Sequence, residues 1–206
     1  MSNRFRRSVS AITASLALLL AGCAGGSTTQ PGGASGEVQG AAAEANNSEV
    51  LAPFGLSDVS AAEVVDLLDV TTLADRNTDL FASVRPSSLL VRGPDGSEEE
   101  LPLPEDSFYL SFAPYVNHTH DCFFHSLTTC VGELQNEPID LSIVNAADGT
   151  VVVDETVTTF DNGFYGLWLP ADEEFDLSVS YSGMSVTSRI GTGEDDPTCV
   201  TTLPLT

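Results

Sequence analysis

The chain has 206 residues, of which 30 are acidic and seven are basic, so its formal net charge is −23 at pH 7. This charge argues against nucleic acid and against anionic lipid surfaces as partners, because both are polyanions. The length allows one or two domains.

The first 22 residues are predicted to be a lipoprotein signal peptide. Three arginines within the first seven residues precede an apolar run, Ala11 to Leu20, that is too short to span a bilayer as a stable helix. The following Leu-Ala-Gly-Cys resembles a bacterial lipobox, which implies cleavage before Cys23 and lipidation of that cysteine. The alternatives are an uncleaved anchor and an ordinary signal peptide with a chance cysteine.

Residues 23–47 are predicted to form a flexible linker. Small and polar residues dominate this segment, and it has too few apolar side chains to bury a core. Its composition suits a tether between a lipid anchor and the folded remainder of the chain.

A small helical region is predicted over residues 48–86. Ser60 and Glu63 have the spacing of a capping box, which would start an amphipathic helix that runs to about Asp69. A second short helix is predicted over residues 75–84, and it would end before Pro86. We interpret both helices as structural, with no functional cluster of titratable groups.

Residues 87–206 are predicted to form an antiparallel β domain. Short apolar runs separated by turn residues are typical of a sandwich or an open barrel. The expected fold class is therefore mainly β, with a sandwich-like C-terminal domain and a small α-helical N-terminal part. Pro114 predicts a sheet edge or a bend, and exposed strand edges would allow a homodimer. The predicted strands cover residues 89–92, 100–103, 107–116, 139–144, 151–158, 163–169, 174–181, 185–190 and 199–203.

One stretch concentrates groups that bind metals. It reads NHTHDCFFHSLTTCVGEL and contains all three histidines and two of the four cysteines. His118, His120 and Cys122 alternate, so an extended backbone would place their side chains on one face. His125 and Cys130 follow. Imidazole and thiolate donors suit soft or borderline metals, so this stretch predicts a metal site.

Three cysteines, Cys122, Cys130 and Cys199, remain once Cys23 is lipidated. An odd number in an oxidising compartment leaves at least one thiol free, metal-bound or paired between chains. A disulfide between Cys122 and Cys130 would close a short loop and stabilise the fold by roughly 2.5 kcal/mol. The alternative is a dithiol that binds copper, and one pair could alternate between both states. Taken alone, Cys199 fits a lone buried thiol in the last strand.

Three separated blocks of the sequence resemble, in the same order, the CueP family of bacterial periplasmic copper-binding proteins. They read THDCFFHSLTTCVGEL, TTFDNGFYGLWLP and DDPTCVTTL. The resemblance covers roughly Leu90 to the C-terminus and extends more weakly back to Pro53. It implies a small secreted copper binder whose cysteines hold the metal, and by motif these are Cys122, Cys130 and Cys199.

The leading hypothesis is a lipid-anchored extracytoplasmic protein of copper homeostasis and resistance. It would sequester Cu(I) through the cysteine cluster and pass it to a secreted cuproenzyme. We expect His125 among the ligands or next to them, while His118 and His120 would receive Cu(II) first. Zinc is a substitute metal that would accept the same donors.

Two alternatives belong to other classes. One is an enzyme, a thiol-dependent cupric reductase or thiol–disulfide protein that uses Cys122 and Cys130. Against it, the chain lacks the Cys-x-x-Cys motif that commonly lowers a thiol pKa. The other is a structural lipoprotein with one disulfide and no metal.

The remaining polar residues near the motif blocks have plainer interpretations. Met184 is expected to pack in the core or a loop. Asp121 and Glu133 flank the cysteine motif, where they would either face solvent or orient a histidine. The Asp-Asn-Gly sequence at residues 161–163 is typical of a turn.

Overall fold

The structure is a computed structural model that describes residues 44–206. The predicted signal peptide, the lipidation of Cys23 and residues 23–43 of the predicted linker lie outside the described residues. Across residues 44–206, no helix has both the length and the apolar character needed to cross a membrane.

The N-terminal part contains one α-helix, α1 (Ala61–Asp69), which follows a 3-10 turn, η1 (Ala52–Phe54). The predicted capping box is confirmed. The Glu63 N–H donates to Ser60 Oγ at 3.2 Å, and the Ser60 N–H donates to Glu63 Oε2 at 2.8 Å. These bonds satisfy amides that a helix start leaves without partners.

The predicted helix over residues 75–84 is wrong. The chain makes turns after α1 and then forms a strand, β1 (Phe81–Val84). All four residues of β1 pair with β2 (Ser88–Arg92), and Ala82 and Val84 are fully buried. Tertiary pairing therefore overrides a weak local helix preference. The boundary predicted between residues 86 and 87 stays a prediction, although β1 and β2 pair across it.

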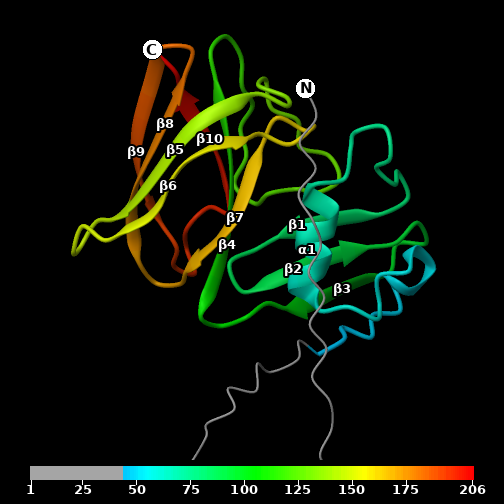
Figure 1. Cartoon of the computed structure of the whole chain (residues 1–206). Coiled ribbons are helices and arrows are strands. Elements are labelled where there is room, and N and C mark those ends of the chain that lie inside the picture. The colour runs from blue at the N-terminus through cyan, green and yellow to red at the C-terminus, as the bar shows by residue number, and fades with distance from the viewer. Residues whose placement is uncertain (1–43) are drawn as a thin grey trace, which may run out of the picture. The chain divides into compact units, whose positions relative to one another are not determined.

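Ten strands form three sheets in the described part of the chain (Figure 1). Their orders are β1-β2-β3, β10-β4-β7 and β6-β5-β8-β9. Each pairing is antiparallel except that of β10 with β4, which is parallel. The predicted mainly-β class with antiparallel sheets is confirmed. The other strands are β3 (Glu98–Pro102), β4 (Ser107–Tyr115), β5 (Pro138–Asn145), β6 (Val151–Thr158), β7 (Tyr165–Pro170), β8 (Glu174–Tyr181), β9 (Met184–Gly191) and β10 (Cys199–Pro204).

Strand β4 lies between β10 and β7, but its pairing with β7 ends at Phe112, so Pro114 pairs only with β10 and is locally at an edge. Pro114 pairs with Leu203, immediately after a register shift in β10 between Val200 and Leu203. Proline has no N–H to donate to the ladder, and an irregular pairing tolerates that loss. The register shift in β10 next to Pro114 is a local irregularity of the kind that a proline in a strand indicates.

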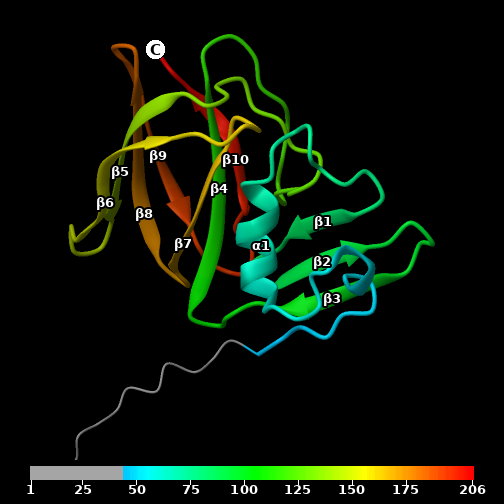
Figure 2. The same cartoon turned by 45° about the vertical axis from the view of Figure 1, so that its right-hand side comes forward.

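Side chains alternate across β4, and this alternation positions the site. Phe108, Leu110 and Phe112 are buried in the core that the β10-β4-β7 and β6-β5-β8-β9 sheets share. Tyr109 points to the other side, where it joins the core of α1 and the β1-β2-β3 sheet, and Ala113 contacts the cysteines. Figure 2 shows α1 beside the β1-β2-β3 sheet, with β4 and β7 on the other side of the helix. One strand therefore separates the main core from the candidate site.

Candidate metal centre

Three cysteine sulfurs meet between the segment that follows β4 and the start of β10. Cys122 and Cys130 belong to that segment, and Cys199 is the first residue of β10. Cys122 and Cys199 form a disulfide with their Cα atoms 5.6 Å apart, and Cys130 Sγ lies 3.6 Å from Cys122 Sγ. The cysteines pack with Ala113 and Phe164. The structure thus brings together the three cysteines that the resemblance selects.

The disulfide considered between Cys122 and Cys130 is not the one that the structure contains. Cys122 is bonded to Cys199, which is 77 positions away in sequence, and Cys130 is the free cysteine of the described residues. The parallel pairing of β10 with β4 carries Cys199 into the motif segment, where its N–H donates to Phe123 O at 3.1 Å. Sequence spacing alone could not reveal this long-range contact.

Cys130 is buried at the end of a tight turn. Its N–H donates to Ser126 O at 3.1 Å, and the Ser126 N–H donates back to Cys130 Sγ at 3.4 Å. Arg76 Nη1 donates to Cys130 O at 2.8 Å. These hydrogen bonds hold Cys130 in place, with its sulfur beside that of Cys122.

His125 is fully buried and rigidly held beside the sulfurs. Its backbone N–H donates to Thr198 Oγ1 at 3.0 Å, and its ring lies 4.7 Å from the Phe164 ring, centroid to centroid. Nε2 lies 2.9 Å from Asp69 Oδ1, whereas Nδ1 is buried without a hydrogen-bond partner. A nitrogen of this ring and the sulfurs of Cys130 and Cys199 all lie within 4.8 Å of one another. His125 is therefore placed as a nitrogen donor next to two sulfurs.

Asp69 is a buried member of the site that the sequence reasoning missed. Its Oδ1 faces His125 Nε2 and accepts from Asn162 Nδ2 at 3.0 Å, while Oδ2 accepts from Tyr109 Oη at 2.7 Å. Burial acts to raise the pKa of Asp69, but His125 and the hydrogen bonds outweigh it, so this pKa lies below its usual value. Burial likewise acts to lower the pKa of His125, and the Asp69 charge overcomes it and raises that pKa to about 9. The two groups form a buried ion pair.

Two weak signals in the sequence could have identified this network. Asp69 follows Ala61 and Val65 at intervals of four, so it belongs to the buried face of α1. An acid there is unusual because the C-terminal end of a helix carries partial negative charge. Asn162 does have the expected turn role, since its Oδ1 accepts from the Phe164 N–H at 2.8 Å, but its amide nitrogen donates to Asp69 as well.

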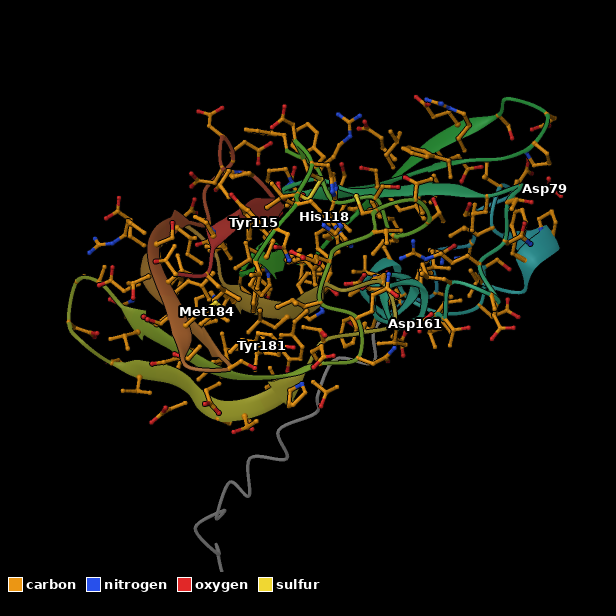
Figure 3. All side chains as sticks on the ribbon, turned by 90° about the horizontal axis from the view of Figure 1, so that it is seen from above. Asp79, Tyr115, His118, Asp161, Tyr181 and Met184 are labelled. Carbon is orange, nitrogen blue, oxygen red and sulfur yellow. A yellow bond between two sulfur atoms is a disulfide. The ribbon has the colours of Figure 1, made fainter. Side chains whose placement is uncertain are left out.

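The two remaining histidines are more exposed and occupy different positions. A nitrogen of His120 and the sulfurs of Cys122 and Cys130 lie within 4.8 Å of one another. His118 belongs to neither set of donors found in residues 44–206 and lies beyond the end of β4. Its side chain is 76% exposed, with Nδ1 3.5 Å from Glu133 Oε1. Figure 3 looks down on this end of the molecule and labels His118.

Glu133 anchors the segment that contains His118. It accepts from the backbone N–H groups of Val116, Asn117 and His118 at 2.7 to 3.3 Å. Partial burial opposes its charge, but these bonds prevail and lower the pKa of Glu133 to about 2. The predicted partnership of Glu133 with a histidine is thus mainly a set of hydrogen bonds from the backbone.

Met184 packs against the core shared by the β10-β4-β7 and β6-β5-β8-β9 sheets, as expected, and Figure 3 labels it beside Tyr181.

The donors form two overlapping sets that share Cys130. The inner set contains His125, Cys130 and Cys199, and the outer set contains His120, Cys122 and Cys130. The disulfide joins one sulfur of each set, so its reduction would release two further thiols for metal binding. Sulfur and imidazole donors in this combination fit copper, and they fit zinc as well.

Comparison with known proteins agrees with the donor chemistry. The family described as periplasmic copper-binding protein CueP matches residues 63–204. A crystal structure of S.CueP is similar to this chain, with a TM-score of 0.70 and 39% identity, and the match covers 76% of this chain and 94% of that one. None of the curated proteins matches the chain. The family match spans well over half of the sequence and includes Asp69 and all three clustered cysteines, so this chain belongs to the CueP family of periplasmic copper-binding proteins.

Proposed function

We propose that the protein sequesters copper in the periplasm as Cu(I), bound by the thiolates of Cys122, Cys130 and Cys199 with His125 as a nitrogen donor. The observation that carries the proposal is the meeting of three sulfurs, with Cys130 Sγ 3.6 Å from the disulfide sulfur of Cys122. Soft thiolate ligands select Cu(I) over harder metals. A cluster of this kind accounts for an odd number of cysteines without leaving an unused thiol.

Reduction of the disulfide precedes binding in this proposal. A dithiol reductant would give two electrons and two protons to the Cys122–Cys199 bond, leaving two thiols in the protein and a disulfide in the reductant. Cu(I) would then displace protons from the three sulfurs. The protein would therefore take up copper in its reduced state and lose sulfur ligands on oxidation. Delivery to a secreted cuproenzyme would proceed by ligand exchange on the outer side, where Cys122 is partly exposed. Lipidation at Cys23 would hold this exchange at a membrane surface.

The test is a Cu(I) titration of the reduced protein under anaerobic conditions, against a competing chelator and with free thiols counted. A Cys23→Ser background restricts the count to the three clustered cysteines. We expect bound Cu(I) to remove all three reactive thiols from the count. Each single Cys→Ser change in the cluster should weaken Cu(I) binding by about 100-fold or more, whereas Met184→Leu should not. Unchanged affinity in all three cysteine variants would rule out the three-thiolate site.

A second candidate function is thiol-dependent reduction of Cu(II), and the free thiol of Cys130 beside a disulfide favours it. Two thiolates would each give one electron to a Cu(II) ion, forming one disulfide and two Cu(I) ions, and an added thiol would restore the pair. Turnover of many Cu(II) ions per chain with added thiol, lost in Cys130→Ser, would support an enzyme. Strictly stoichiometric reduction would favour the sequestering role. Zn(II) competition in the same titration would measure how well zinc substitutes.

A further inference from the structure

Asp69 occupies a position where the helix itself does not require a carboxylate. It is the last residue of α1 and fully buried, yet its side chain forms no cap for the helix. An acid at this end is also opposed by the helix dipole. Its carboxylate is directed at His125 Nε2 at 2.9 Å. A buried charge is tolerated when it is paired and hydrogen-bonded, so the partner explains the burial better than the helix does.

The ion pair determines which side of the imidazole faces the sulfurs. Because Nε2 is held by Asp69, the opposite ring nitrogen, Nδ1, is the one free to bind a ligand. It is buried and has no hydrogen-bond partner, which is unusual for a polar atom in a protein interior. The sulfurs of Cys130 and Cys199 lie within 4.8 Å of a nitrogen of this ring. With Nε2–H directed at Asp69, the neutral imidazole carries its lone pair on Nδ1, so Cu(I) binding there would displace the proton that Nδ1 holds in the ion pair.

The carboxylate is itself held in place by hydrogen bonds from two segments, and a third leaves room for it. Tyr109 on β4 donates to Oδ2 at 2.7 Å, and Asn162 before β7 donates to Oδ1 at 3.0 Å. Gly166 on β7 leaves the room that this contact needs, since a Cβ there would overlap Tyr109 Oη and press on Asp69 Oδ2. Such fixed support is typical of the groups that orient metal ligands.

We propose that Asp69 is a positioning residue for copper, which holds His125 with Nδ1 toward the sulfurs of Cys130 and Cys199. The inference rests on the proposed function and extends it, because it makes His125 the nitrogen ligand of the inner donor set. It also assigns tighter binding to the inner set than to the outer one, because His120 has no buried carboxylate partner in residues 44–206. A helix far from the motif segment thereby contributes to copper affinity.

Two substitutions separate the charge of Asp69 from its shape. Asn162 must donate to Asp69, because its own oxygen already accepts from the Phe164 N–H. In Asp69→Asn, the amide oxygen would therefore occupy the Oδ1 position and still accept from His125, while the Tyr109 hydroxyl turns to accept from the amide nitrogen. Asp69→Asn keeps the orientation of the ring and removes the charge. Asp69→Ala removes both.

The first measurement is Cu(I) affinity by chelator competition, using the full reduced chain. We expect Asp69→Ala to weaken binding about 10- to 100-fold, the usual effect of losing a partner of a metal ligand, and Asp69→Asn to weaken it less. Asp66→Asn is the matched control on the same helix, since Asp66 is exposed and bonds Trp168 instead. In a His125→Ala background, Asp69→Ala should cause no further loss, because the two act through one contact.

The second measurement is 15N NMR of the His125 ring. This readout is independent of Cu(I) affinity. In the metal-free protein we expect a protected Nε2–H signal that Asp69→Ala abolishes, and Cu(I) should shift Nδ1. Wild-type affinity in a folded Asp69→Ala protein, independent effects of Asp69 and His125, or a Cu(I) shift at Nε2 would each overturn the inference. If Asp69→Ala does not fold, Asp69→Asn supplies both readouts. Loss of binding in the cysteine variants alone would leave the proposed function standing without this inference, whereas a wild type that binds no Cu(I) would remove both.

Discussion

The two sides of the sulfur cluster differ sharply although the same short stretch supplies both. On the inner side, His125 is fully buried, ion-paired and fixed beside Cys130 and Cys199. On the outer side, His120 lies near the sulfurs of Cys122 and Cys130. His118 belongs to neither donor set, and its side chain is 76% exposed beside Glu133. The β10-β4 pairing and α1 enclose one side and leave the other open. Residue type and spacing thus predict a metal site, but burial by other segments of the chain determines which histidine has a fixed orientation beside the sulfurs.

The inner side can be disturbed without changing any donor. Gly166→Ala would force a Cβ against Tyr109 Oη and Asp69, so the carboxylate could no longer keep its place. Overpacking of this kind typically costs about 1–3 kcal/mol, and we expect the free energy of unfolding in urea to fall by about that much. Gly193→Ala is the matched control, because the nearest atom to its Cβ is the flexible end of Asp196 at 3.3 Å. Equal stability of the two variants would contradict the packing described at Asp69.

On the outer side, the stability that ionised Glu133 contributes should be lost in acid. The pKa of Glu133 is lowered to about 2 in the folded protein, from an ordinary value of 4.5. A lowered pKa contributes stability above pH 4.5, and this contribution disappears as the pH falls toward 2. We expect Glu133→Gln to lower the free energy of unfolding by about 2 kcal/mol at pH 6.

That difference between wild type and Glu133→Gln should shrink steadily when urea unfolding is repeated between pH 5 and pH 3. A difference that stays constant over this range would show that Glu133 acts through packing instead of charge. Asp121→Asn is a suitable control, because Asp121 lies in the same segment and is exposed.

Much of this molecule could be predicted from its sequence because much of it is local. The capping box at Ser60, the alternation of β4 and the turn signals of the later strands each act over a few residues. The partner of Cys122 could not be predicted, since β10 reaches it through a parallel pairing 77 residues away. The same holds for β1, where the strand partner outweighs local helix preference.

The role of Asp69 escaped sequence reasoning for a related reason. Its sequence neighbours are those of an ordinary amphipathic helix, and the partners that define it come from three other segments of the chain. The motif blocks contain those partners, His125 and Asn162, but nothing in their spacing indicates a buried acid 56 residues before the histidine. The sequence does contain one indication of this role, which is an acid on the apolar face of the predicted helix.

The smallest expected effect is the sharpest test of the difference between the two sides. His118→Ala should leave Cu(I) affinity within about twofold of wild type, because an exposed imidazole outside the donor sets loses little when removed. His125→Ala, seven residues later, should lower affinity about 10- to 100-fold, since it removes the fixed nitrogen beside two sulfurs. Both are measured by chelator competition on reduced protein, with His120→Ala as the intermediate case. If His118→Ala weakened Cu(I) binding as much as His125→Ala, exposure would not distinguish the histidines, and the outer segment would have to close over the metal when it binds.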